Sequence, residues 1–141
     1  MKHFLISVMI AASAPAFAVL TTGDLLSAAS CNSVADNAFY AREFEAKFGK
    51  PVRNEQGAFW YTATGDAYNS QIREVFVSSN PTMHFVGIVL AGKPDEVVKG
   101  VPTSVMYPTN VFPTNNYWIG TDGRSIMWHD GKYTKMFCTQ K

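Results

Sequence analysis

The feature that most constrains the fold is an apolar run at residues 83–91, which reads Met-His-Phe-Val-Gly-Ile-Val-Leu-Ala. Apolar residues occupy both sets of alternating positions, so both sides of an extended strand would be hydrophobic. This pattern predicts a strand in the middle of a sheet, with cover on both faces. A short buried helix would give the same run. The β-branched residues and the flanking turn signals, Ser-Asn-Pro before and Gly-Lys-Pro after, favour the strand.

The start of the chain resembles a secretory signal peptide. Lys2 and His3 form a basic end, residues 4–14 are apolar, and residues 16–18 read Ala-Phe-Ala, a small-x-small cleavage pattern. We therefore expect cleavage after Ala18 and a mature chain of residues 19–141. The mature chain is long enough for one domain with one core. Its apolar runs are too short to predict a membrane span.

Two cysteines, Cys31 and Cys138, lie near opposite ends of the mature chain. In an exported protein such a pair predicts one disulfide, which here would close nearly the whole chain. In the chain-entropy model, a loop of about 100 residues stabilises the folded state by roughly 4–5 kcal/mol. The alternative is lipidation of Cys31, because residues 28–31 read Ala-Ala-Ser-Cys. A lipoprotein box should adjoin the apolar core of the signal, whereas Asp24 and two threonines intervene here.

Two helices are predicted before the first strand. Residues 22–30 could form a short one with Thr22 as N-cap. A longer helix is expected over residues 33–48, with Ser33 as N-cap, Asp36 at the third helical position and Gly49 as C-terminal cap. Its apolar residues recur at three- and four-residue spacing and predict one buried stripe, made of Val34, Ala38, Ala41, Phe44 and Phe48.

The rest of the mature chain is mostly strand-like. Strands are expected at 58–64, 72–78, 83–91, 104–107, 117–119, 125–129 and 132–138, with a one-and-a-half-turn helix at 94–99. Asp130-Gly131 predicts a two-residue hairpin turn. Short connections favour antiparallel pairing. The predicted fold is therefore α+β: an N-terminal helix at about 33–48 packed on a mostly antiparallel sheet, in a single domain with one disulfide.

A short internal repeat is the most unusual motif. Residues 107–110 read Tyr-Pro-Thr-Asn, and residues 112–115 read Phe-Pro-Thr-Asn. Proline fixes φ and removes a donor, so two such units predict a stiff loop or a bulged sheet edge. Rigid aromatic side chains on a loop suit a binding surface. The candidate binding residues are Tyr107, Asn110, Phe112, Asn115 and Trp118. The alternative is that these aromatics pack on the core while the prolines protect an edge.

No set of residues predicts catalysis, a cofactor or a metal. The clustered His/Cys spacing of a zinc site is absent from the sequence. His129 could be oriented by Asp130 as a general base, but an aspartate at that place is already explained by the hairpin turn. The carboxylates fall mostly at caps, turns and helix surfaces, and no spacing isolates an acid–base pair. The sequence therefore leaves enzymatic activity open and favours its absence.

Two segments resemble the membrane-bound and periplasmic c-type lysozyme inhibitors. One is the tail, with Tyr-Trp-Ile-Gly at 117–120, Ser-Ile-Met-Trp at 125–128, Gly131 and Cys138. The other is residues 62–68, Thr-Ala-Thr-Gly-Asp-Ala-Tyr, which is similar to their Ser-Ala-Ser-Gly-x-x-Tyr inhibitory loop. Threonines replace the serines here, the loop is distant from the tail, and a long helix precedes the strands. The resemblance implies a class of exported binding protein.

Two functional hypotheses follow. The first is an exported protein, periplasmic or secreted, that binds a protein partner in the cell envelope, for example as an inhibitor or immunity protein. The formal net charge of +1 gives no electrostatic case for nucleic acid or an anionic membrane. The second is a small enzyme or ligand carrier that uses a cleft between helix 33–48 and the sheet, where His84, His129 and Asp130 would act. A structural envelope component is a third possibility.

Overall fold

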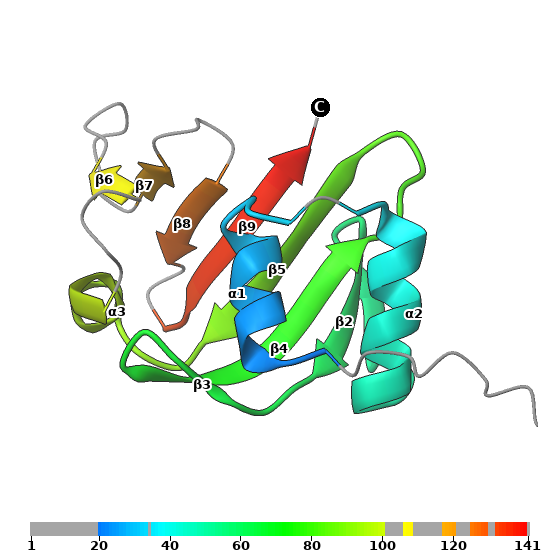
Figure 1. Ribbon diagram of the computed structural model, residues 1–141, viewed down its shortest axis with the longest axis horizontal. Helices are drawn as coiled ribbons and strands as arrows, with labels where there is room; N and C mark the ends of the chain where they lie inside the picture. The colour runs from blue at the N-terminus through cyan, green and yellow to red at the C-terminus, as the bar shows by residue number, and fades with distance from the viewer. Residues whose placement is uncertain are drawn as a thin grey trace, which may run out of the picture.

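An antiparallel sheet, covered on one face by helices, forms the body of the molecule (Figure 1). The computed structural model describes residues 20–33, 35–100, 106–108, 117–120, 125–129 and 132–140. Within these residues the sheet has nine strands in the order β1-β2-β4-β5-β9-β8-β7-β6, with β3 paired to β4. The strands are β1 Arg53–Glu55, β2 Ala58–Thr62, β3 Asp66–Ala67, β4 Ser70–Ser78, β5 His84–Leu90, β6 Met106–Pro108, β7 Tyr117–Gly120, β8 Ser125–His129 and β9 Thr134–Gln140.

The apolar run at 83–91 forms β5, which lies between β4 and β9 as the predicted central strand. Its two faces differ. Val86, Ile88 and Leu90 belong to a large core shared with all three described helices. Val89 belongs to a second cluster, against which Phe85 packs, and no described helix contributes to it. The expectation of cover on both faces is therefore only half right, because aromatic side chains rather than a second helical layer lie on the other face.

Helix α1, Thr22–Ala29, begins one residue earlier than the sequence suggested, with Thr21 as its N-cap. The Thr21 N–H donates to the Asp24 carboxylate at 2.7 Å, and the Thr21 hydroxyl accepts from the Asp24 N–H at 3.2 Å. This reciprocal pair is a capping box. The helix lies across β5 and β9 (Figure 1), and its own residue Leu25 is buried.

Helix α2, Asn37–Phe48, starts later than predicted, with Asp36 rather than Ser33 as its N-cap. The Phe39 N–H donates to the Asp36 carboxylate at 2.7 Å. Ser33 does not cap the helix, because residues 35 and 36 are not helical and the first turn begins only at Asn37; the Ser33 N–H donates to the Ser27 carbonyl near the end of α1. Its hydroxyl lies 3.0 Å from the Tyr40 hydroxyl. Gly49 caps the C-terminus with φ of 87°, as predicted.

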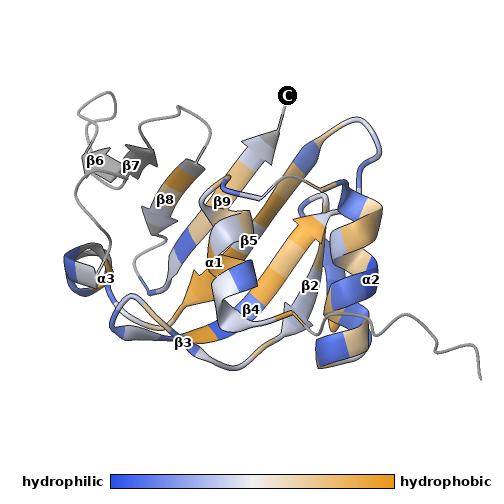
Figure 2. Ribbon diagram, viewed as in Figure 1, coloured by the Kyte–Doolittle hydropathy of each residue, from blue (hydrophilic) through white to orange (hydrophobic). Residues whose placement is uncertain are grey.

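The buried side of α2 also differs from the predicted stripe. Tyr40 and Phe44 are buried, and Ala41 and Phe48 pack beside them. Ala38 is exposed, and Val34 lies outside the described residues. In Figure 2 the hydrophobic colours concentrate on β4 and β5, and α2 alternates between hydrophilic and hydrophobic residues. A helix on the surface of a sheet shows this alternation because one side faces water.

Cys31 and Cys138 form the predicted disulfide, with Cα atoms 5.1 Å apart and a sequence separation of 107. Both are buried. The bond joins the segment after α1 to β9 and so closes a loop that contains most of the chain. A disulfide-bonded Cys31 has no free thiol for a lipid, which removes the lipidation alternative.

Helix α3, Pro94–Gly100, matches the predicted short helix, and its Val97 is buried in the large core. The three helices and the sheet therefore share one core. In the part of the chain that the structure describes, no helix has the length and apolar character to cross a membrane. Residues 1–18 lie outside that part, so signal-peptide cleavage after Ala18 stays a prediction.

Candidate functional site

The face of the sheet opposite α1 and α2, which we call the helix-free face, carries one row of paired residues across six strands. Directly paired residues of antiparallel strands share a face. The row runs from β1 to β8 through Arg53, Trp60, Phe76, Gly87, Phe137 and Ile126. Sequence reasoning missed this row because its residues come from segments far apart in the chain. A period-two pattern predicts each strand separately but not which strands are neighbours.

Aromatic rings form the centre of this face. The Phe76 ring centroid lies 4.7 Å from that of Trp60 and 6.2 Å from those of Phe85 and Phe137. Gly87 leaves room for this cluster. A Cβ there would lie 2.4 Å from the Phe76 ring and 2.6 Å from the Phe137 Cβ. The glycine is thus needed for close approach of its neighbours.

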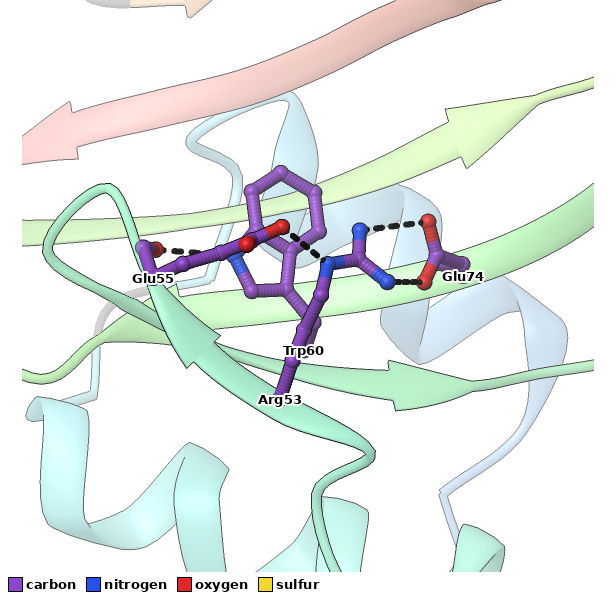
Figure 3. Close-up of polar contacts among 4 residues, drawn as sticks. All are labelled: Arg53, Glu55, Trp60 and Glu74. Carbon is purple, nitrogen blue, oxygen red and sulfur yellow. Dashed lines mark hydrogen bonds and ion pairs between the residues drawn. The ribbon is translucent and has the colours of Figure 1, made fainter.

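Arg53 lies over Trp60 between two carboxylates (Figure 3). Its Nε is 2.6 Å from Glu55 Oε1, its Nη2 donates to Glu74 Oε1 at 2.9 Å, and its Nη1 also contacts Glu74. The guanidinium carbon is 4.5 Å from the Trp60 ring centroid. The hydrogen bonds to Glu74 raise the pKa of the Arg53 guanidinium. Because Arg53 already contacts the carboxylates of Glu55 and Glu74, its guanidinium does not offer a binding site for another anion. It instead links β1 to β4 above the Trp60 ring.

Lys135 covers the other side of the aromatic cluster. Its Nζ lies 5.3 Å from the Trp60 ring centroid and 5.1 Å from that of Trp128. Lys135 pairs with Val89 on β5, and Val89 is only 2% exposed. A lysine stem can cover apolar surface while its ammonium stays near water and near aromatic faces. Lys135 and Arg53 thus place two positively charged groups against the same aromatic cluster.

One of the predicted binding residues, Tyr107, lies at the outer edge of the described sheet. It is in β6, which pairs only with β7 among the described strands, so β6 is the last described strand on that side. Pro108, also in β6, fits an edge because proline cannot donate to a ladder. Trp118 lies one strand further in, on β7, where it pairs with Pro108 and Met127. Asn110, Phe112 and Asn115 lie outside the described residues.

The structure does not bring the two candidate histidines together. His84 pairs with Gln140, and His129 pairs with Thr134, at opposite ends of β9. Six residues of strand separate these points by about 20 Å. Asp130 lies outside the described residues. His84 and His129 therefore do not share one cleft, and the orientation of His129 by Asp130 stays a prediction.

A shallow depression does lie between α2 and the sheet, as the cleft hypothesis expected. Its volume is about 340 Å³, and Asp36, Asn37, Asn80 and His84 contribute polar groups to its wall. The Asn37 amide donates to the Met83 carbonyl at 2.8 Å, which ties α2 to the start of β5. Among the described residues, no three or more His, Cys, Asp or Glu side chains are grouped so that they could hold a metal ion.

The two segments that resemble lysozyme inhibitors lie apart in the sheet. Residues 62–68 begin at the end of β2 and include β3, whereas the tail contributes to β7, β8 and, with Cys138, β9. Between β2 and the strands of the tail lie β4 and β5. We compared the chain with protein-family models, curated proteins and solved structures, and none of the three comparisons found a match. The functional argument therefore depends on the geometry of this chain alone.

Proposed function

We propose that this chain is an exported protein, periplasmic or secreted, that acts by binding a protein partner in the cell envelope. Its binding site is the outer edge of the sheet, formed by β6, β7 and residues 107–115. The buried disulfide supports export because such bonds persist in oxidising compartments. An inhibitor or immunity protein of an envelope-active enzyme is the kind of role that this proposal includes.

The observation that carries the proposal is the place of Tyr107 and Pro108 in the outermost of the described strands. An edge strand has backbone groups without a neighbouring strand, which a partner can contact or extend. Proline limits uncontrolled pairing at this edge, and it stiffens the repeat that carries Tyr107 and Phe112. A rigid aromatic pair loses little conformational entropy when it becomes buried in an interface.

The test is capture by the mature chain 19–141 from envelope extract and culture medium. The double variant Tyr107→Ala/Phe112→Ala should lose a stoichiometric partner that the parent captures, while its melting temperature stays within a few degrees. Phe39→Ala is the matched control, because Phe39 is an aromatic residue of α2 that is 37% exposed. This control should still capture the partner, and calorimetry with the purified partner should reproduce both results. Equal capture by the double variant, or a large loss of its stability, would contradict the proposal.

The depression beside His84 supports a second candidate, a small-ligand carrier or enzyme. If this candidate is correct, a small-molecule screen should find ligands that raise the melting temperature of the parent. His84→Ala should then remove the shift while the Tyr107→Ala/Phe112→Ala variant keeps it. A screen without any ligand, combined with partner capture at the edge, would discard this candidate.

A further inference from the structure

The depression between α2 and the sheet has a largely apolar wall. Ala38 and Ala41 of α2, Phe59 of β2 and Pro81 in the loop after β4 form its apolar part. Its volume of about 340 Å³ lies at the lower end of the range for small-molecule sites, about 300–1,000 Å³. A hollow with apolar walls and a few polar groups is the usual form of such a site.

Hydrogen bonds within the protein hold the two sides of the depression together. The Asn37 amide donates to the carbonyls of Met83 and Asn80, at 2.8 and 3.4 Å. The Ser78 hydroxyl donates to the Asn80 carbonyl at 3.2 Å and accepts from the Asn80 N–H at 3.1 Å. The Asn80 side-chain oxygen accepts from the Thr82 N–H at 2.9 Å. These bonds fix the shape of the depression before any ligand arrives, which lowers the entropic cost of binding.

The wall of the depression contains one anionic group. Asp36 is the only aspartate, glutamate, lysine or arginine among the described residues that line it. One carboxylate oxygen caps α2 by accepting from the Phe39 N–H, and no cation of the described residues forms an ion pair with Asp36. The His84 ring, in the same wall, has no hydrogen-bond partner in the part of the chain that the structure describes. Both groups can accept hydrogen bonds from a ligand, and the carboxylate can also compensate a positive charge.

We infer that this depression binds a small organic ammonium ion, with its ammonium group at Asp36 and its apolar body against Ala41 and Phe59. An ammonium group donates three hydrogen bonds, and its positive charge complements the carboxylate. An alcohol has one donor and no charge, and an anionic ligand would be repelled by Asp36. The inference rests on the second candidate function, the small-ligand site beside His84, and names the class of its ligand.

Titrations of the mature chain with its disulfide intact compare three probes that share one apolar body: 2-phenylethylammonium, 2-phenylethanol and 3-phenylpropanoate. Two-dimensional ¹H–¹⁵N NMR spectra show which residues each probe affects. The ammonium probe should shift the signals of the residues that line the depression. It should bind at least about fivefold more tightly than the alcohol, because hydrogen bonds between charged groups are stronger than those between neutral groups. The anionic probe should bind most weakly.

Asp36→Asn tests the charged contact without removing the cap of α2, because asparagine and aspartate are about equally good N-caps. In this variant the ammonium probe should bind no more tightly than the alcohol. Asp66→Asn is the matched control for the same chemical change. Asp66 lies in β3 and pairs with Gln71, whereas Ser78 beside the depression lies at the other end of β4. The control should keep the preference of the parent for the ammonium probe.

The outcomes separate this inference from the candidate function on which it rests. Equal affinity of the parent for the ammonium and alcohol probes, or an unchanged preference in Asp36→Asn, would overturn the ammonium assignment and leave a ligand site. Signals that shift only in other parts of the chain, or in none, would also overturn the inference. The small-molecule screen then decides the candidate function separately.

Discussion

Replacing Gly87 with alanine tests how closely the strands approach on the helix-free face. The added methyl would lie 2.4 Å from the Phe76 ring, 2.6 Å from the Phe137 Cβ and 2.7 Å from the Met136 carbonyl oxygen. The Phe76 ring can swing aside. The other two atoms are held by the pairing of β5 with β9, so the strands themselves would have to move.

The magnitude follows from two opposing effects. Overpacking of a well-packed core costs about 1–3 kcal/mol. A glycine-to-alanine change recovers about 0.4–1 kcal/mol by reducing the conformational freedom of the unfolded chain. The larger effect is steric, so we expect Gly87→Ala to lower the free energy of unfolding by about 1–2 kcal/mol.

Gly23→Ala is the matched control for the same chemical change. Gly23 lies in α1, and a Cβ there would be 3.5 Å from the Thr21 hydroxyl oxygen, an ordinary contact distance. Alanine favours helix over glycine by up to about 1 kcal/mol, so this variant should be more stable than the parent. Urea unfolding at one fixed protein concentration, followed by circular dichroism and tryptophan fluorescence, measures both. A Gly87→Ala variant as stable as the parent would refute the close packing of Phe76 and Phe137 over β5.

Three further predictions concern the frame that holds the site. Reduction of the Cys31–Cys138 bond should lower the free energy of unfolding by about 4–5 kcal/mol, which denaturant titration with and without reductant measures; an effect below about 1 kcal/mol would contradict the chain-entropy argument. Asp36→Ala should cost about 1 kcal/mol through loss of the α2 cap, and an unchanged urea midpoint would place the cap elsewhere. Hydrogen bonds from the Thr21 N–H and hydroxyl lower the pKa of Asp24, so its stabilising effect is complete above the unfolded carboxyl pKa of about 3.9 and disappears as the pH falls through the lower folded pKa. Asp24→Asn should therefore lose stability at neutral pH and show a weaker acid dependence of its melting temperature; a parallel pH profile would contradict this.

Local signals in the sequence were sufficient for much of the fold. The alternation and β-branched content of residues 83–91 predicted β5, and Gly49 marked the end of α2. The two cysteines predicted their own bond, because each has only the other as a partner. The predictions of β5 and of the end of α2 depend only on residues close together in the sequence. The prediction of the disulfide depends on two cysteines that can pair only with each other. The two prolines close together favoured a stiff loop or a bulged edge over a central strand, and Tyr107 lies in the last of the described strands on its side.

Tertiary structure decided where α2 begins and which residues share a face. Ser33 and Asp36 are both good N-caps, but the Asp36 carboxylate accepts from the Phe39 N–H whereas the Ser33 hydroxyl lies against the Tyr40 hydroxyl. Lys135 and Glu74 lie far apart in sequence, yet both pair with Val89. Strand order and register depend on pairings between distant segments, which local periodicity does not encode. The helix-free face and the separation of His84 from His129 therefore emerged only when the strands were placed side by side.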